Sequence, residues 1–265
     1  MQFLIGDASW VEEMKEKVQG SFAQTLLNDE NVLLNGYRQA LADRPGLIRT
    51  PTREVNQSFL LEEGLEGRVE AGCNIAVNAG RQALQVLGID ALLCGVVGPL
   101  KSPGPWRDDE ISRYVGEVAI FLFDKEVDCL QLEGFSDWHS FSKAIETLKM
   151  VINASIPLSA FYNLEETLTE ELLEKLRGLA QSADLDLLGL ELTLEQALSL
   201  PERQDWSIPM GFMIKGGSKP LTSQEEAQAL ERILSYDPSL VLGGPGMTGK
   251  AWGEISQALQ SLHAT

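Results

Sequence analysis

Short apolar runs alternate along this chain with longer segments whose apolar residues recur at helical spacing. This alternation is typical of βαβ units, in which helices connect the parallel strands of one sheet. Eight runs are candidate strands, and a candidate helix follows each of them. The runs cover residues 3–5, 46–50, 91–97, 128–133, 157–161, 185–190, 208–214 and 240–243.

Two helices show clear signals in their sequences. After the fourth run, apolar residues recur every three or four positions and therefore share one helical face. These residues are Phe141, Ile145, Leu148 and Ile152. After the seventh run, Ser223 is followed three residues later by a glutamate, which predicts a capping box with Ser223 as the N-cap.

Eight βα units without a shift in composition or a linker rich in Pro, Gly or Ser predict one α/β domain over residues 1–265. The expected fold is a single closed (β/α)8 TIM barrel. A doubly wound open sheet is the alternative, because a strand count alone does not prove closure. In a barrel, the loops after the C-terminal strand ends share one rim, where we expect the ligand-binding residues. The segment 101–109 is the one long irregular loop that we expect there.

The charge balance narrows the range of partners. The chain has 39 acidic and 21 basic residues, a formal net charge of −18. Nucleic acids and anionic membranes attract surfaces rich in Lys and Arg, so we expect neither as a partner. No apolar run reaches the roughly 18 residues that span a bilayer, and the first residues do not resemble a signal peptide. We therefore expect a soluble cytoplasmic protein.

A glycine-rich turn follows the last predicted strand. Residues 244–250 have the G-x-x-x-x-G-K spacing of a phosphate-binding loop. Ala251, however, stands where such a loop carries the Ser or Thr that binds magnesium, and only 15 residues follow Lys250. These features argue against a nucleotide-hydrolysing fold. A simpler seat for phosphate or carboxylate at Gly244 and Gly246 remains open, because glycine turns before a helix often bind anions.

Six motifs near the predicted strand ends occur in a fixed order over nearly the whole chain. They are LIRTPTREVN at 47–56, GLEGRVE with NIAV at 64–77, VVGPL at 96–100, VDCLQLE at 127–133, GLELT at 189–193 and GGPGMT at 243–248. In order and spacing they resemble motifs of the homocysteine S-methyltransferase family, such as GLxxRVxEINxxAV, GVNCT and GGCCGT. The resemblance implies a (β/α)8 barrel, in agreement with the strand count.

The resemblance also implies a zinc site, which this sequence does not support. Members of the family hold the sulfur of homocysteine on a zinc ion that three cysteine thiolates bind. The matching positions here are Leu192, Pro245 and Gly246, and none of them can ligate a metal. The cysteines that are present lie elsewhere, in the middle of predicted strands (Cys94, Cys129) or in a helix (Cys73), and form no Cys-x-x-Cys pair. We therefore expect reduced thiols, no zinc, no other metal and no resident cofactor.

Glu133 is the best candidate for contact with a ligand. It matches the family glutamate that binds the amino group of homocysteine, and a carboxylate suits an ammonium group. The alternative is an ion pair with Arg49 or Lys215 that only fills the barrel mouth. Lys215 itself either binds an anion, acts as an amine nucleophile or forms a salt bridge. The full set of candidate ligand-binding residues is Asp7, Thr50, Thr52, Asn56, Glu133, Lys215, Gly244 and Gly246.

Three functional hypotheses remain open. The first is a diverged homocysteine S-methyltransferase-like protein that binds a small amino-bearing ligand at the rim and transfers a methyl or another small group without zinc. A partner protein that carries a corrinoid or a folate would then supply the methyl group. The second is a non-catalytic relative that binds a ligand or a protein. The third is an enzyme for a phosphorylated or carboxylated small molecule, which uses Lys215 and the glycine turn.

Overall fold

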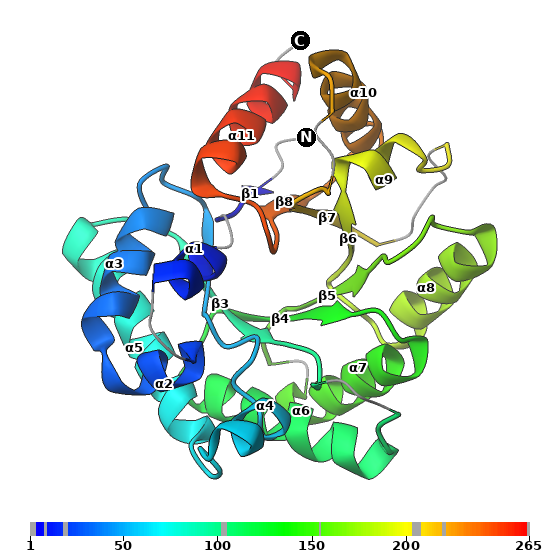
Figure 1. Cartoon of the computed structure of the whole chain (residues 1–265). Helices are drawn as coiled ribbons and strands as arrows, with labels where there is room; N and C mark the ends of the chain where they lie inside the picture. Colours follow the sequence, from blue (N-terminus) through cyan, green and yellow to red (C-terminus); the bar gives the residue numbers. More distant parts are fainter. Residues whose placement is uncertain are drawn as a thin grey trace.

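Eight parallel strands form one sheet in the order β1-β8-β7-β6-β5-β4-β3-β2. The structure is a computed structural model that describes residues 4–7, 10–17, 21–101, 105–153, 155–202, 208–218 and 221–263. Backbone hydrogen bonds join the two outermost strands: the Asp7 N–H donates to the Leu47 carbonyl at 3.0 Å, and the Gly46 N–H to the Ile5 carbonyl at 3.1 Å. The predicted single (β/α)8 TIM barrel is thereby confirmed, and the open sheet is wrong (Figure 1).

All eight predicted strands are present. The strands are β1 (Leu4–Ile5), β2 (Leu47–Arg49), β3 (Leu92–Val97), β4 (Cys129–Phe135), β5 (Leu158–Asn163), β6 (Leu187–Thr193), β7 (Met210–Lys215) and β8 (Leu240–Gly243). The main differences are at the C-terminal ends, where β4, β5 and β6 extend two or three residues beyond the predicted bounds. These extensions bring additional residues to the functional rim.

The helices surround the sheet in the expected way, with two departures. The helices are α1 (Trp10–Lys17), α2 (Phe22–Asn28), α3 (Glu30–Ala40), α4 (Gln57–Leu60), α5 (Val69–Leu87), α6 (Asp108–Asp124), α7 (Trp138–Ile152), α8 (Glu170–Ser182), α9 (Leu194–Leu198), α10 (Ser223–Leu234) and α11 (Gly249–His263), with a 3₁₀ turn at Leu61–Glu63. Three helices, α1 to α3, follow β1, and only the five-residue helix α9 follows β6. Figure 1 shows α1 closer to the barrel axis than α3 and α5.

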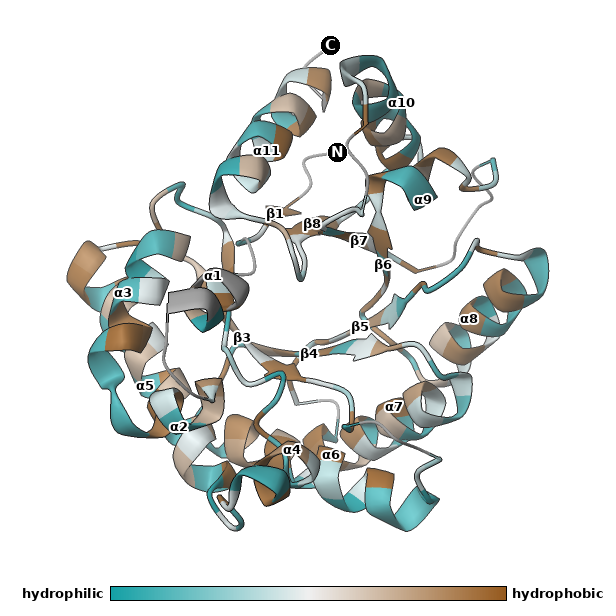
Figure 2. Ribbon diagram, in the orientation of Figure 1, coloured by the Kyte–Doolittle hydropathy of each residue, from teal (hydrophilic) through white to brown (hydrophobic). Residues whose placement is uncertain are grey.

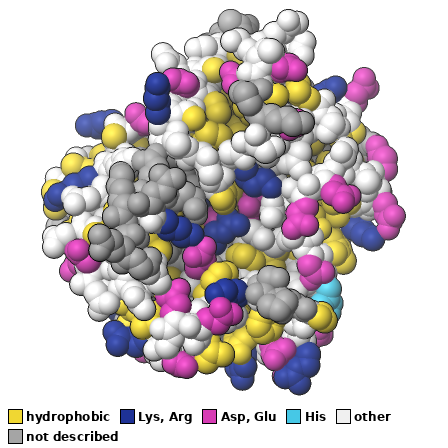
Figure 3. All heavy atoms as spheres, viewed as in Figure 1, with side chains coloured by type: hydrophobic (Ala, Val, Ile, Leu, Met, Phe, Trp, Pro, Cys, Tyr) yellow, Lys and Arg dark blue, Asp and Glu magenta, His cyan; other side chains and the backbone are white. Residues whose placement is uncertain are grey.

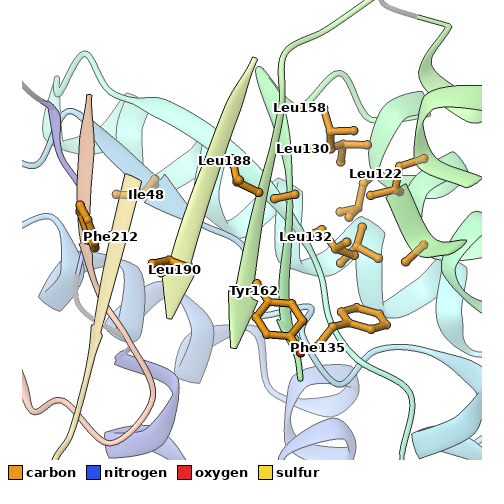
Figure 4. Packing of buried hydrophobic residues seen from close by; sticks show 14 of the residues in the cluster. Ile48, Leu122, Leu130, Leu132, Phe135, Leu158, Tyr162, Leu188, Leu190 and Phe212 are labelled. Atoms are coloured by element: carbon orange, nitrogen blue, oxygen red, sulfur yellow. The ribbon is translucent and has the colours of Figure 1, made fainter. Parts of the chain in front are cut away.

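Strand residues alternate between two apolar layers. One layer lies between the strands and the helices, and Figure 4 shows Leu130, Leu132 and Leu158 directed toward Leu122 of α6. The second layer fills the lower part of the barrel interior. Its buried members are Leu47, Cys94, Phe161, Leu187, Met213, Leu240 and Leu242. Figure 2 shows the corresponding pattern, with mostly hydrophobic strands and helices of mixed character. The buried charged residues of the barrel interior lie above this layer, at its C-terminal end.

Several local predictions need correction. The N-cap of α10 is Thr222, not Ser223: the Thr222 hydroxyl accepts from the Glu225 N–H at 3.3 Å, and the Glu225 carboxylate accepts from the Thr222 N–H at 2.8 Å. Cys129 is the first residue of β4 rather than a mid-strand residue. The segment 101–109 is not irregular throughout, because α6 begins at Asp108, and residues 102–104 lie outside the described residues. Within the described residues, the structure has no helix long and apolar enough to cross a membrane.

Candidate functional site

Four charged residues lie at the C-terminal end of the barrel interior. They are Arg49 on β2, Glu133 on β4, Glu191 on β6 and Asp7, which lies two residues after β1. All are buried, with exposed fractions of 2% for Asp7, 6% for Arg49, 5% for Glu133 and 0% for Glu191. Successive side chains of a strand point to opposite faces of the sheet. The apolar neighbours of these residues, such as Ile48, Leu132 and Leu190, face the helices, so the charged side chains face the barrel interior. Figure 3 shows acidic and basic side chains next to each other near the middle of one face of the molecule.

Arg49 is the centre of this charged group. Its Nε donates to Asp7 Oδ1 at 2.8 Å, and its Nη1 donates to Glu133 Oε2 at 3.4 Å. Its Nη2 donates to the backbone carbonyls of Asp7, at 3.2 Å, and of Gly243. An arginine suits this position because its planar guanidinium carries five donors and keeps its charge when buried. Arg49 therefore links β1, β2, β4 and β8 across the barrel.

Arg53, in the loop after β2, extends the network to β6. Its Nη1 lies 3.2 Å from Glu133 Oε1 and 3.6 Å from Glu191 Oε2. Gly134 makes room for it: a Cβ at Gly134 would lie 2.5 Å from Arg53 Nη2. Gly134 also has a φ of +84° and lies where the register of β4 shifts, as at a β-bulge. The bulge aims the Gly134 N–H at Glu191 Oε1, which accepts it.

The predicted ion pair of Glu133 with Arg49 is present, and the one with Lys215 is absent from the described contacts. Glu133 Oε2 accepts from Arg49 and also from Gln131 Nε2, at 2.7 Å, while Glu133 Oε1 accepts from Arg53. Both carboxylate oxygens are therefore occupied. Amine binding by Glu133 stays a prediction, and such an amine would have to compete with two guanidinium groups.

Asp7 and the threonines also have partners within the protein. Asp7 pairs with Arg49, and burial raises the pKa of its carboxyl although Arg49 opposes this shift. The Thr50 hydroxyl accepts from the Val96 N–H at 2.9 Å, and the Thr52 hydroxyl donates to the Val96 carbonyl at 2.6 Å. Asn56 donates from Nδ2 to the Pro99 carbonyl at 2.9 Å and caps α4. These contacts fasten the loop after β2 to β3 and thereby position Arg53.

Lys215 lies apart from the ion-pair network. Its Nζ donates to Asn163 Oδ1 and, at 2.9 Å, to the Leu164 carbonyl. Partial burial lowers the pKa of the Lys215 ammonium, and Glu191 opposes this shift. The residue therefore has neutral hydrogen-bond acceptors as its direct partners, and its roles as an anion-binding group or a nucleophile remain predictions.

The glycine turn after β8 is hydrogen-bonded to the loop after β7. The Gly244 N–H donates to the Ile214 carbonyl at 2.8 Å, and the Gly216 N–H donates to the Pro245 carbonyl at 2.9 Å. A Cβ at Gly216 would lie 2.3 Å from the Gly246 carbonyl oxygen, so the two turns pack closely. The backbone amides of Gly244 and Gly216 therefore already donate to protein carbonyls and are not free to bind a phosphate.

Of the three positions that match zinc ligands, Leu192 does not face the barrel interior. Leu192 is fully buried and belongs to the apolar layer between strands and helices, so its side chain points away from the barrel interior. Pro245 and Gly246 lie in the turn after β8. Within the described part of the chain, no group of three His, Cys, Asp or Glu residues has the arrangement of a metal site.

One hollow borders the charged network, and a second lies beside it, next to Gly134. A small cavity of about 30 Å³ has room for one or two water molecules. It is lined by Asp7, Arg49, Thr50, Arg53, Val96 and Glu133, and by Trp10, Val11 and Lys15 of α1. A larger open hollow of about 730 Å³ lies between the loops after β3, β4 and β5. Its lining includes Trp106, Gly134, Phe135, Asp137 and His139.

Glu191 is absent from the candidate ligand-binding set, as are Arg49 and Arg53. It is fully buried, accepts one hydrogen bond at Oε1, and has no hydrogen-bond partner at Oε2. The sequence contains a signal for it, because Leu190 and Leu192 flank a single charged residue near the end of an apolar strand. In such a strand the charged residue faces the barrel interior, where only a partner or a ligand can compensate its burial.

We expect Glu191→Gln to raise the free energy of unfolding at neutral pH by about 1 kcal/mol, the scale of an unsatisfied buried group. Burial raises the pKa of Glu191 above its ordinary value of 4.5. A raised pKa in the folded state means that the carboxyl stabilises the fold when protonated, and that this contribution is lost as the pH rises through the folded-state pKa. Urea titrations should therefore show equal stability of both proteins below about pH 4.5 and a more stable variant at pH 7. Equal stability at both pH values would contradict this expectation.

Comparisons with known proteins agree with the fold. No family model matches the chain, and no curated protein matches its sequence. The metallated homocysteine methyltransferase MmuM from Escherichia coli is similar with a TM-score of 0.74 and 15% identity, over 99% of this chain and 96% of that chain. Its oxidized form has a TM-score of 0.72 and 17% identity, over 98% of this chain and 96% of that chain. The carboxyl transferase domain Y628A of Rhizobium etli pyruvate carboxylase has a TM-score of 0.56 and 12% identity, over 98% of this chain and 44% of that chain. At such identities the similarity shows a shared (β/α)8 fold.

Proposed function

We propose that this protein is a diverged homocysteine S-methyltransferase-like barrel that binds a small zwitterion of amino-acid size at its C-terminal mouth. The observation that carries the proposal is the cluster of four buried charged side chains there, Asp7, Arg49, Glu133 and Glu191, with the partly exposed Arg53 bonded to it. A molecule with one ammonium and one carboxylate group matches this mixture of acidic and basic partners.

Burial of charge supports a functional role for the cluster. Charged side chains are rarely buried, because their desolvation often exceeds what ion pairing returns. The lower part of the same barrel is filled by apolar residues, so the fold itself does not require charges in its interior. Clusters of perturbed ionisable groups are common at functional sites, and barrels bind ligands at this end.

Arg53 is the residue best suited to the carboxylate of the ligand. Its side chain is 25% exposed, compared with 7% for Arg49, whose donors are all directed at protein groups. It lines the small cavity together with Thr50 and Lys15. That cavity holds only water-sized groups, so a ligand of amino-acid size requires α1, which covers it, to shift. Loops and short helices that cover barrel mouths often move in this way.

The reaction that fits the resemblance is the transfer of a methyl or another small group without zinc. The donor atoms that zinc needs are missing at Leu192, Pro245 and Gly246, so the residues present do not fit this metal. In this proposal, a partner protein with a corrinoid or a folate provides the methyl group. A non-catalytic relative is the second candidate, and the mutual pairing of Arg49 with Asp7 and Glu133 favours it.

We expect Arg53→Ala to weaken binding of the zwitterions L-homocysteine and L-methionine at least tenfold, because hydrogen bonds between charged groups contribute about 1.5–3 kcal/mol. Isothermal titration calorimetry measures the affinities. Arg113→Ala is the matched control, since Arg113 is an exposed arginine on α6 that contacts only Tyr114 in the described structure. Unchanged affinity in Arg53→Ala, or no binding of either zwitterion to the original protein, would contradict the proposal.

The same ligands separate the catalytic from the non-catalytic candidate. Mass spectrometry of L-homocysteine incubated with methyltetrahydrofolate, methylcobalamin or S-methylmethionine detects a methylated product if the protein is a transferase. Binding without any product favours the non-catalytic relative.

A further inference from the structure

We infer that the ammonium group of the ligand binds at Glu191 Oε2, inside the barrel, rather than at Glu133. This inference rests on the proposed function, because it concerns the same site, and it names the group that this site recognises. Glu191 thereby becomes the residue that selects ligands with an amino group.

The two glutamates differ in the acceptors that they leave open. Glu133 accepts hydrogen bonds from Arg49, Arg53 and Gln131, so both of its oxygens are occupied. Glu191 Oε1 accepts the Gly134 N–H, whereas Oε2 accepts none, and the nearest cationic atom, Arg53 Nη1, lies 3.6 Å away. Buried polar atoms without a partner are rare in native proteins and require an explanation. A ligand that donates an N–H supplies the missing hydrogen bond.

The net charge of the network also supports ammonium binding at Glu191. Asp7, Glu133 and Glu191 carry three negative charges when ionised, and Arg49 and Arg53 carry two positive ones, so the network has one negative charge in excess. Lys215 opposes the rise of the Glu191 pKa, but it forms no ion pair with Glu191 in the described structure, since its Nζ donates to Asn163 and Leu164. An unpaired charge in a poorly solvated interior is strongly unfavourable. A bound ammonium would balance it.

The position of Glu191 is compatible with access for a small molecule. Its side chain reaches from β6 past β5 to the backbone of Gly134 on β4, so it lies across the upper part of the barrel interior. Gly134 also borders the open hollow of about 730 Å³ between the loops after β3, β4 and β5. Glu191 itself is fully buried and lines neither hollow, so a ligand reaches it only when the loops at this end of the barrel shift. Burial raises the pKa of this carboxyl in the absence of a ligand, and a nearby cation would oppose that shift.

This arrangement predicts a defined selectivity. The carboxylate oxygen needs a donor with an N–H, so primary ammonium compounds should bind and quaternary ammonium compounds should not. An amino acid should likewise bind more tightly than the same molecule without its amino group, because only the amino acid satisfies Glu191 Oε2.

The experiment compares the original protein, Glu191→Gln and Glu174→Gln. Glu174 is the matched control, because it is an exposed glutamate on α8 that is bonded to Arg177, outside the network and both hollows. Calorimetry measures the affinity for L-methionine and for 4-methylthiobutanoate, which lacks the amino group. Thermal unfolding is measured with methylammonium chloride and with tetramethylammonium chloride. Glu191→Met serves as a second variant if Glu191→Gln does not fold.

The original protein and Glu174→Gln should bind L-methionine at least tenfold more tightly than 4-methylthiobutanoate and should be stabilised by methylammonium only. Glu191→Gln should lose both preferences. If Glu191→Gln keeps the preference for L-methionine, the inference is wrong and the proposed function stands. If only the methylammonium effect exists and depends on Glu191, the inference stands and the proposed function is wrong. If the original protein shows neither effect, both are wrong.

Discussion

Replacing Arg49 by methionine should lower the free energy of unfolding by about 3–5 kcal/mol, the usual result when one partner of a buried ion pair is removed. Arg49 donates to Asp7 and Glu133 and to two backbone carbonyls, and it is 6% exposed. Methionine fills part of the space but leaves two carboxylates without their main cation. Urea titrations at pH 7 measure the loss.

Two further variants test the cause of this loss. The triple variant Asp7→Asn/Arg49→Met/Glu133→Gln should be more stable than Arg49→Met alone, because it also removes the two uncompensated charges. Arg113→Met, at an exposed arginine, should change the stability by no more than about 0.5 kcal/mol. A loss below about 1 kcal/mol in Arg49→Met, or a triple variant that is even less stable, would show that the charges are not energetically coupled.

The strands and the closed barrel could be predicted from the sequence because both depend on local patterns. A run of apolar residues followed by helical periodicity predicts one βα unit, and eight such units suffice for a barrel. The errors lie at the ends of elements, where a shift of one residue changes the result. Thr222 and Ser223 are both good N-caps, for instance, and only the backbone of the loop decides between them.

The charged network was harder to predict, because its partners are far apart in the sequence. The pair of Arg49 with Glu133 could be proposed, since both are charged residues at predicted strand ends. The contacts of Arg53 with Glu133 and Glu191 depend on a loop conformation and on the bulge at Gly134, which no periodicity encodes. Glu191 is recognisable as a residue at a strand end, but it is not among the candidate ligand-binding residues, because the family motif directs attention to Leu192, one residue further, which faces the opposite side of the strand.

These contacts bear on the proposed divergence from the homocysteine S-methyltransferase family. The family resemblance implies thiolates around a metal at the rim, whereas the described part of this chain has a continuous ion-pair network there. Ion pairs between strands hold the mouth together without a metal, but they also occupy Glu133, the glutamate that the resemblance assigns to the amino group. In our proposal, the carboxylate that recognises the amino group is therefore on β6 rather than on β4. Arg53 lies between these two carboxylates, so a change in its position should affect both the ion pairs and the proposed ammonium site.

Gly98→Ala should be the second most disruptive change, with a loss of about 3 kcal/mol, the upper part of the range for overpacked sites. Gly98 is buried directly after β3, and a Cβ there would lie 1.9 Å from the Arg53 carbonyl oxygen and 2.7 Å from Arg53 Cγ. A backbone oxygen cannot move away as a flexible side chain can. The whole loop would have to shift, and Arg53 with it, so ligand binding should weaken together with stability.

Gly178→Ala provides the control for this prediction. Gly178 lies within α8, and a Cβ there would meet no atom within 4 Å. Alanine has the higher helix propensity, so this variant should be more stable by about 0.5–1 kcal/mol and should bind L-methionine unchanged. Thermal unfolding and calorimetry on both variants give the result. If Gly98→Ala is as stable as the original protein and binds L-methionine equally well, the loop after β2 does not need its close approach to β3, and Arg53 is not held in place by Gly98.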